Sequence, residues 1–222
     1  MCGRFVLTAD TDMVQMAFNL TSVAHPIAPR FNIAPSQPIA VITNDDPKTL
    51  TYHQWGLIPS WSKDPKMGSK MINARSETAA EKPAFRSAFK RRRCLIPATG
   101  FFEWKKQGGG KVPMFIHMQD RQVFAFAGLW EIWHSPEGGE IRTATILTTE
   151  PNEFMAEIHD RMPVILQAKD YETWLAAGDQ KADDLMPLMK PFPAELMKAY
   201  PVSTFVNSPG NDTPETIEPL AS

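Results

Sequence analysis

Between residues 93 and 149 the chain contains short runs rich in apolar and aromatic residues, separated by glycine-rich segments. Runs of this kind are typical of strands joined by hairpin turns. Turns are therefore expected at residues 107–110 and 135–139. The strands expected in this region cover residues 93–98, 101–106, 114–118, 123–133 and 141–149.

Helical and strand-like segments alternate in the rest of the chain. Further strands are expected at residues 2–8, 39–43, 50–57 and 163–166. Helices are expected at residues 13–20, 76–81, 152–158, 168–177 and 183–189. Strands joined by hairpins and interrupted by helices predict an α+β fold with an antiparallel, barrel-like β core and peripheral helices. We expect a single domain that spans residues 1–222.

Composition limits the class of protein. No stretch approaches the roughly 18 apolar residues that cross a bilayer, and no secretory signal is recognisable, so no membrane association is expected. The two cysteines, Cys2 and Cys94, do not make a disulfide framework, which favours a reducing, cytoplasmic setting. Cys94 lies in an apolar, strand-like run and is expected in the core. Nothing in the sequence requires more than a monomer.

Charge is unevenly distributed along the chain. Residues 1–115 carry 16 Lys and Arg against 8 Asp and Glu, whereas residues 116–222 carry 7 against 17. The net charge of −2 argues against a uniformly basic nucleic-acid-binding protein. The asymmetry instead predicts one electropositive face, although a basic run such as 90–93 is also typical of a solvated edge.

Cys2 directly follows Met1, and a small residue at position 2 permits removal of the initiator methionine. We therefore expect the mature chain to begin with Cys2. Its α-amine, with a pKa of about 8 against roughly 10.4 for lysine, would be partly neutral and nucleophilic at pH 7. Amine and thiol together can capture an aldehyde, first as a Schiff base and then as a thiazolidine ring. The alternative is a small buried residue at the start of a strand.

Two further residues are candidates for proton transfer. Glu103 interrupts an aromatic strand, and alternation places it opposite Phe102 and Trp104, where a carboxylate is uncommon unless it is paired. It is either an ion-pair partner or an acid–base group. His159 lies beside charged residues in a loop, which is typical of a general acid–base group and also of a surface histidine.

Metal and cofactor motifs are not recognisable. The five histidines and two cysteines lack close metal-ligand spacing. There is neither a glycine-rich phosphate loop before a helix nor a Gly-x-Ser-x-Gly sequence. We therefore expect no metal and no cofactor.

Several short segments, in this order, carry a resemblance to one known family. They are Met1-Cys2-Gly3-Arg4-Phe5, Arg30-Phe31-Asn32-Ile33-Ala34-Pro35, Trp55-Gly56-Leu57-Ile58-Pro59, Ile72-Asn73-Ala74-Arg75-Ser76-Glu77, Arg93-Cys94-Leu95-Ile96-Pro97, Gly100-Phe101-Phe102-Glu103-Trp104 and His159-Asp160-Arg161-Met162-Pro163, with a late match at 202–207. Over nearly its whole length the chain resembles the SOS response-associated peptidase (SRAP) family, whose members process abasic sites in DNA.

The resemblance implies a covalent mechanism. Cys2 would become joined to the ring-opened sugar of an abasic site, and Asn73 would orient the cysteine adduct. Glu103 would handle protons at the amine and the sugar. His159 would assist ring opening and reversal of the crosslink. The implied partner is single-stranded DNA that contains abasic sites, and the protein would associate with the nucleoid when bound to it.

The same resemblance implies a set of DNA contacts. Arg4, Arg75 and Arg161 would hold phosphates. The residues implied to meet flanking bases and sugars are Asn32, Pro35, Trp61 and Trp104. Ser62 follows Trp61 where some relatives carry a second tryptophan, so a base-stacking wedge would be reduced here.

Two other functions use the same residues. In a cysteine-type peptidase, Cys2 would be the nucleophile, His159 its base and Asn73 the orienting or oxyanion group, and self-removal of Met1 would be one such reaction. In a non-catalytic single-stranded nucleic-acid-binding protein, arginines and tryptophans would bind the strand and Cys2 would be incidental. The sequence alone leaves these alternatives open.

Overall fold

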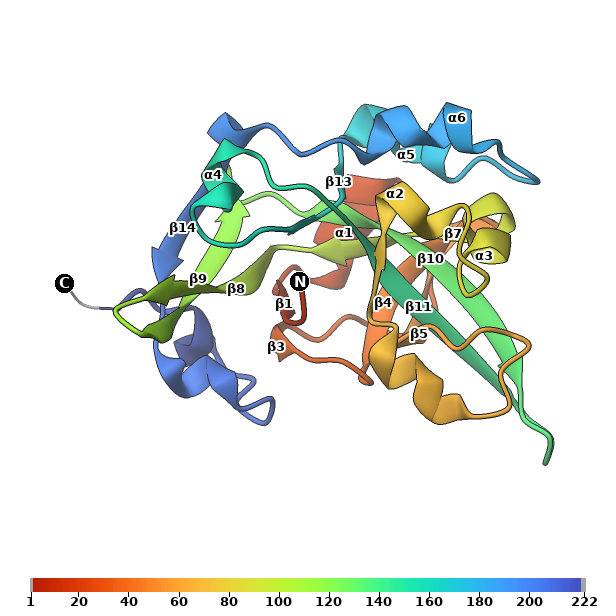
Figure 1. Ribbon diagram of the computed structural model, residues 1–222, viewed down its shortest axis with the longest axis horizontal. Helices are drawn as coiled ribbons and strands as arrows, with labels where there is room; N and C mark the ends of the chain where they lie inside the picture. Colours follow the sequence, from red (N-terminus) through yellow and green to blue (C-terminus); the bar gives the residue numbers. More distant parts are fainter. Residues whose placement is uncertain (1, 221–222) are drawn as a thin grey trace.

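The computed structural model describes residues 2–220, in which short helices surround two β-sheets (Figure 1). The larger sheet contains β2 (Ser22–Val23), β4 (Pro38–Thr43), β5 (Asp46–Trp55), β6 (Asn73–Arg75), β7 (Arg93–Ala98), β10 (Phe124–His134), β11 (Glu140–Thr149), β12 (Met162–Pro163) and β13 (Ile165–Leu166). The smaller sheet contains β1 (Phe5–Leu7), β3 (Arg30–Ile33), β8 (Gly100–Gln107), β9 (Gly110–Met118) and β14 (Met197–Pro201). This mixed α+β architecture confirms the predicted fold class.

Five strands of the larger sheet close into a barrel. Their order is β11-β10-β7-β4-β5, and all these neighbours are antiparallel. The ring closes where β5 pairs in parallel with β11, through Gln54 opposite Thr143 and Trp55 opposite Ala144. An odd number of strands cannot alternate in direction all the way around, so one parallel pair is required. Closure leaves these strands no free edge within the ring.

The smaller sheet brings the start of the chain against the barrel. Its order is β14-β9-β8-β1-β3, so β1 lies between β8 and β3. The ring of Phe5 packs edge-on against Trp55 at 5.2 Å and Phe126 at 5.7 Å between ring centroids. This aromatic contact fixes β1, and therefore the residues just before it, at the junction of the two sheets.

Helices are short and lie around the sheets (Figure 1). They are α1 (Thr11–Phe18), α2 (Ser76–Ala79), α3 (Arg86–Arg91), α4 (Glu153–Ala156), α5 (Tyr171–Trp174) and α6 (Ala182–Leu185). The 3₁₀ turns are η1 (Pro65–Lys70), η2 (Ala168–Asp170), η3 (Met186–Met189), η4 (Ala194–Leu196), η5 (Thr204–Asn207) and η6 (Pro214–Ile217). Across residues 2–220, none of the helices combines the length and the apolar character that crossing a bilayer requires.

The hairpin turn predicted at 107–110 is present and tight. Gln107 pairs with Gly110, so the loop consists of Gly108 and Gly109, with φ of +58° and +79°. Positive φ at both loop positions matches the twist of the flanking strands and favours glycine. The hairpin therefore presents β8 and β9 in a defined register.

Three predicted elements are divided in the structure. The single strand expected at 163–166 is two short strands, because β12 pairs with β11 whereas β13 pairs with β10. The helix expected at 183–189 is α6 followed by η3, and Pro187 in η3 has no N–H to continue α-helical hydrogen bonding. The helix expected at 168–177 is likewise η2 followed by α5.

Candidate active site

Cys2 lies at the junction of the sheets and is completely buried. The residue after next, Arg4, accepts a hydrogen bond at its carbonyl from the backbone N–H of Phe102 on β8. The carbonyl of Cys2 accepts a hydrogen bond of 2.8 Å from the side-chain amide of Asn73. Asn73 begins β6 and stands opposite Ile146 of β11, so barrel strand register sets its position.

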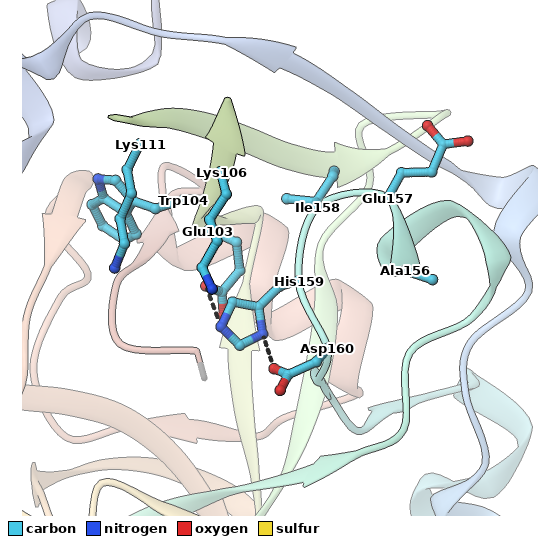
Figure 2. Close-up of a pocket in the computed structure, with 9 residues that line it drawn as sticks. All are labelled: Glu103, Trp104, Lys106, Lys111, Ala156, Glu157, Ile158, His159 and Asp160. Carbon is cyan, nitrogen blue, oxygen red and sulfur yellow. Dashed lines mark ion pairs between the residues drawn. The ribbon is translucent and has the colours of Figure 1, made fainter. Parts of the chain in front are cut away.

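Glu103, whose charge acts on Cys2, also meets His159. The Glu103 carboxylate is 2% exposed, and its Oε2 lies 3.8 Å from His159 Nε2 (Figure 2). Burial raises the pKa of Glu103 above its usual range, against the opposing influence of His159. Burial, and then the nearby Glu103 charge, also raise the pKa of the Cys2 thiol. The site therefore combines a neutral thiol with a carboxyl group that holds its proton to higher pH than usual.

The other edge of the His159 ring is held by two neighbours. Its Nδ1 lies 2.8 Å from Asp160 Oδ1 and 3.1 Å from the backbone nitrogen of Arg161. The Asp160 carboxylate can accept a hydrogen bond from Nδ1 when that nitrogen is protonated, and the Arg161 N–H can donate a hydrogen bond to it when it is not, so the ring keeps its orientation in either tautomer. Sequence reasoning missed Asp160, although its place directly after His159 was the available signal.

A cavity of about 690 Å³ opens beside these residues. Its lining residues come from β8, β9 and the segment around α4: Glu103, Trp104, Lys106, Lys111, Ala156, Glu157, Ile158, His159 and Asp160 (Figure 2). The volume lies within the range of about 300–1,000 Å³ that is usual for ligand sites. Within residues 2–220, no group of three or more His, Cys, Asp or Glu side chains is arranged to hold a metal ion.

Arg4 lies between the cavity and the late part of the chain. Its Nη1 donates hydrogen bonds to Asn32 Oδ1 at 2.8 Å and to the carbonyl of Val206 at 2.7 Å. The guanidinium also lies over the Trp104 ring, 5.9 Å from its centroid. Its buried Nε has no hydrogen-bond partner within residues 2–220. Burial lowers the pKa of Arg4, which leaves a partly desolvated cation over the Trp104 ring.

Asn32 is completely buried, and its side chain points into the protein rather than toward solvent. Its Nδ2 donates to the carbonyls of Val206, Ser208 and Asn211, at 3.2, 3.0 and 2.7 Å. The nearby carboxylate of Asp212 accepts from the backbone of Asn32 at 2.8 Å. The sequence suggested a DNA contact for Asn32; the geometry makes its side chain the anchor of the 206–212 segment.

The same segment orients a second predicted DNA-binding residue. Asn207 accepts a 2.8 Å hydrogen bond from the Trp104 indole. Pro35, which the resemblance places near the strand, lies half-buried in the turn between β3 and β4. The late segment therefore holds Arg4 and Trp104 in place. The sequence resemblance included residues 202–207 but indicated no role for them.

The three remaining residues predicted to contact DNA, Arg161, Arg75 and Trp61, differ in exposure and in the partners of their side chains. Arg161 donates to the Glu77 carboxylate at 2.6 and 2.9 Å and to the carbonyl of Thr148 at 2.7 Å, so its charge is already matched. Arg75 is exposed and makes no side-chain hydrogen bond or ion pair within the part of the chain that is described. Trp61 is 58% exposed.

The loop that carries Trp61 is anchored next to it. The carbonyl of Ser62 accepts a 2.7 Å hydrogen bond from the Trp133 indole, and Ser62 Oγ donates to the carbonyl of Asp64. A loop pinned at the adjacent residue holds the exposed tryptophan at a defined place on the surface. The Ser62 hydroxyl thus stabilises the turn that follows Trp61.

A model of the SOS response associated peptidase (SRAP) family matches residues 1–209. The chain belongs to the SRAP family. It is 48% identical to the abasic site processing protein YoqW of Bacillus subtilis, over 98% of this chain and 99% of that protein. It is 38% identical to the abasic site processing protein HMCES of Gallus gallus, over 78% of this chain and 58% of that protein.

Solved structures share the fold of this SRAP protein. A crystal structure of a Bacteroides thetaiotaomicron protein covers 99% of this chain and 100% of its own, with a TM-score of 0.91 and 28% identity. A Bordetella bronchiseptica protein covers 91% of this chain and 100% of its own, with a TM-score of 0.80 and 28% identity. The architecture described above is therefore shared by other proteins along nearly its full length.

Proposed function

We propose that this SRAP protein processes abasic sites, and that it does so by forming a covalent thiazolidine crosslink between Cys2 and the ring-opened sugar in single-stranded DNA. The convergence of Cys2 with Asn73 and Glu103, and of Glu103 with His159 at the cavity that both of these line, carries the proposal. Family membership and the names of the relatives support the substrate.

The proposed reaction begins once Met1 has been removed. That expected removal lies outside the described residues, and it frees the Cys2 amine. His159 assists opening of the sugar by moving a proton between the ring oxygen and the C1′ hydroxyl. The amine nitrogen then bonds to C1′, and the carbonyl oxygen leaves as water with protons passed through Glu103. A carboxyl group with a raised pKa suits this exchange because it holds its proton to higher pH than an ordinary carboxyl group and can therefore donate it.

Ring closure completes the crosslink. The Cys2 sulfur bonds to C1′ while its proton passes to the nitrogen, which gives a five-membered thiazolidine. A Schiff base alone would serve as an electron sink for β-elimination of the adjacent phosphate, whereas the closed ring removes that sink and keeps the strand intact. Reversal would follow the same proton path through Glu103 and His159.

Asn73 offers an independent sign of a ligand at this place. Its Nδ2 is committed to the Cys2 carbonyl, but its buried Oδ1 has no hydrogen-bond partner within residues 2–220. A buried acceptor without a donor is unfavourable by about 1–3 kcal/mol. A sugar hydroxyl or the thiazolidine N–H would satisfy it, so Asn73 would hold both Cys2 and the captured sugar.

The test is formation of a denaturant-resistant adduct. Protein whose mass confirms an N-terminal Cys2 is incubated with single-stranded DNA carrying one abasic site, and adducts are resolved on a denaturing gel. Without a reductant, we expect an adduct with the wild type and with Cys94→Ala, and none with Cys2→Ala. Cys2→Ala and Cys2→Ser both keep the amine but not the sulfur, so either should give an adduct only after borohydride reduction. An undiminished adduct with unreduced Cys2→Ala would refute the proposal.

The peptidase alternative uses the same residues but needs a different thiol. Cysteine peptidases attack with a thiolate whose pKa is lowered by a neighbouring histidine or helix. Here burial and Glu103 raise the pKa of Cys2, which favours the neutral thiol. Hydrolysis of unrelated peptides that is lost in Cys2→Ser would favour this alternative. Binding that does not discriminate abasic from intact strands would favour the non-catalytic one.

A further inference from the structure

Two lysines at the end of the β8–β9 hairpin line the same cavity as Glu103 and His159. Lys106 and Lys111 are directly opposite each other across the two strands. Both are exposed, and neither takes part in an ion pair within residues 2–220. Like charges at opposed positions destabilise a sheet pair unless an anion lies between them. An anion bound between the two ammonium groups would offset this repulsion.

The hairpin supplies the positive charge of this cavity, whereas the carboxylates of Glu103, Glu157 and Asp160 line other parts of it. No Asp or Glu occurs from Lys105 to Gln119, so the hairpin itself is purely basic. Glu157 also lines the cavity, but Figure 2 shows its carboxylate turned away from the two lysines. An anion that enters the cavity would meet an aromatic face and two ammonium groups together.

Strand periodicity orders this face. Trp104 and Lys106 share one side of β8, and their partners on β9 are Pro113 and Lys111. Further along the same side, Phe102 and its partner Phe115 pack in a buried cluster. Along this side, the buried pair of phenylalanines is thus followed by the indole of Trp104 and then by the ammonium groups of Lys106 and Lys111. This sequence of groups matches a nucleotide strand, whose bases stack on aromatic rings and whose phosphates need cations.

We propose that Lys106 and Lys111 bind a backbone phosphate of the lesion strand beyond the abasic nucleotide. The identification of that strand as DNA rests on the proposed function. Lys106 is three residues from Glu103 along β8, roughly 10 Å at the usual strand rise, so the pair addresses a flanking phosphate rather than the reacting sugar. The hairpin would thereby set the direction in which the strand leaves the site.

The test is non-covalent binding at several salt concentrations. The Cys2→Ala protein and an oligonucleotide with a tetrahydrofuran abasic analogue, which lacks the aldehyde, exclude crosslinking. For single strands, the logarithm of the affinity falls by about 0.7 per neutralised phosphate for each tenfold rise in salt. Loss of one phosphate contact should therefore make the ratio of the affinities at 50 and 200 mM salt about 3-fold smaller. We expect this change for Lys106→Ala/Lys111→Ala, and none for Lys105→Ala, whose side chain does not line the cavity. Lys106→Arg/Lys111→Arg should keep the original slope.

A neutral methylphosphonate, placed at one linkage at a time, locates the phosphate. One flanking linkage should weaken binding to the Cys2→Ala protein but not to the same protein carrying both lysine substitutions. Equal slopes for the double variant and Lys105→Ala would overturn the inference, as would a methylphosphonate effect confined to the linkages of the abasic nucleotide. These binding measurements do not require the covalent adduct. Failure of the crosslinking assay would therefore refute the proposed chemistry without deciding whether the two lysines bind phosphate.

Discussion

The side-chain amide of Asn73 donates a 2.8 Å hydrogen bond to the carbonyl oxygen of Cys2. The bond joins the start of the chain to a strand that pairs with the barrel, across 71 positions of sequence. It holds the residue that we propose as nucleophile without using the amine or the sulfur. The same side chain keeps a buried oxygen available for a ligand.

Asn73→Ala should slow crosslinking without unfolding the protein. The substitution removes one hydrogen bond to Cys2 and the acceptor for the captured sugar, and each hydrogen bond is worth about 0.5–1.5 kcal/mol. We expect the single-turnover rate to fall about 10-fold, with thermal stability close to that of the wild type. Quenched time courses with abasic single-stranded DNA measure the rate. An unchanged rate would contradict the role of Asn73.

Glu103→Gln should raise stability at neutral pH while it impairs the reaction. Burial raises the pKa of Glu103 above its ordinary value of 4.5, so the native state holds its proton to higher pH than the unfolded state does. The stability contributed by the neutral form is present below pH 4.5 and is lost as pH rises through the raised pKa. The free energy of unfolding from urea titrations at several pH values should decline less in Glu103→Gln than in wild type. Parallel curves would contradict this.

The native thiols should resist alkylation. Burial raises the pKa of both Cys2 and Cys94, and the thiolate is the form that reacts with iodoacetamide. At pH 8 we expect alkylation at least about 10-fold slower in native than in urea-unfolded protein, because the thiol pKa is raised by burial. Mass spectrometry of time points gives the rate for each cysteine. Rapid native labelling of Cys2 would indicate a thiolate and would favour the peptidase alternative.

Asn32→Ala should loosen the late segment and, through it, the DNA site. Three carbonyls lose their donor and Arg4 loses an acceptor, so we expect a loss of about 2–3 kcal/mol in the free energy of unfolding. Affinity for single-stranded DNA should fall as well. Asn207→Ala is the comparison, because it frees only the Trp104 indole and should affect binding with a smaller loss of stability. Equal urea midpoints for the two variants would argue against an anchoring role.

Substitution of Arg75 should weaken DNA binding, whereas substitution of Arg161 should lower stability. Arg75 is exposed and without a side-chain partner in the described chain, so Arg75→Ala should reduce the salt slope by about 0.7 and leave stability unchanged. Arg161 is 17% exposed and bonded to Glu77 and Thr148, so Arg161→Ala should lower stability by about 1–2 kcal/mol. Urea denaturation and salt-dependent anisotropy provide the two readouts. The opposite pattern would show that the Glu77 pair opens to bind phosphate.

Local patterns in the chain were sufficient for most of the strands. Hairpin strands such as β8 and β9 are recognisable because the turn chemistry of Gly108 and Gly109 and the apolar runs on either side are encoded within a few residues. The prediction of a single strand at residues 163–166 was wrong, because its hydrogen-bonding partners lie elsewhere in the sequence. These residues divide into β12, which pairs with β11, and β13, which pairs with β10. Pairing of that kind is a property of the packed sheet.

The candidate site shows the same division. The residue types that suit aldehyde chemistry, Cys2 and Glu103 among them, were visible in the sequence because chemistry depends on side-chain identity. Their convergence was decided by closure of the barrel and by the position of β1 between β8 and β3, contacts between segments far apart in the chain. The environment of each side chain was also decided by the tertiary structure. Asn32 is buried, and burial raises the pKa of Glu103, because water is excluded from these side chains only in the assembled fold.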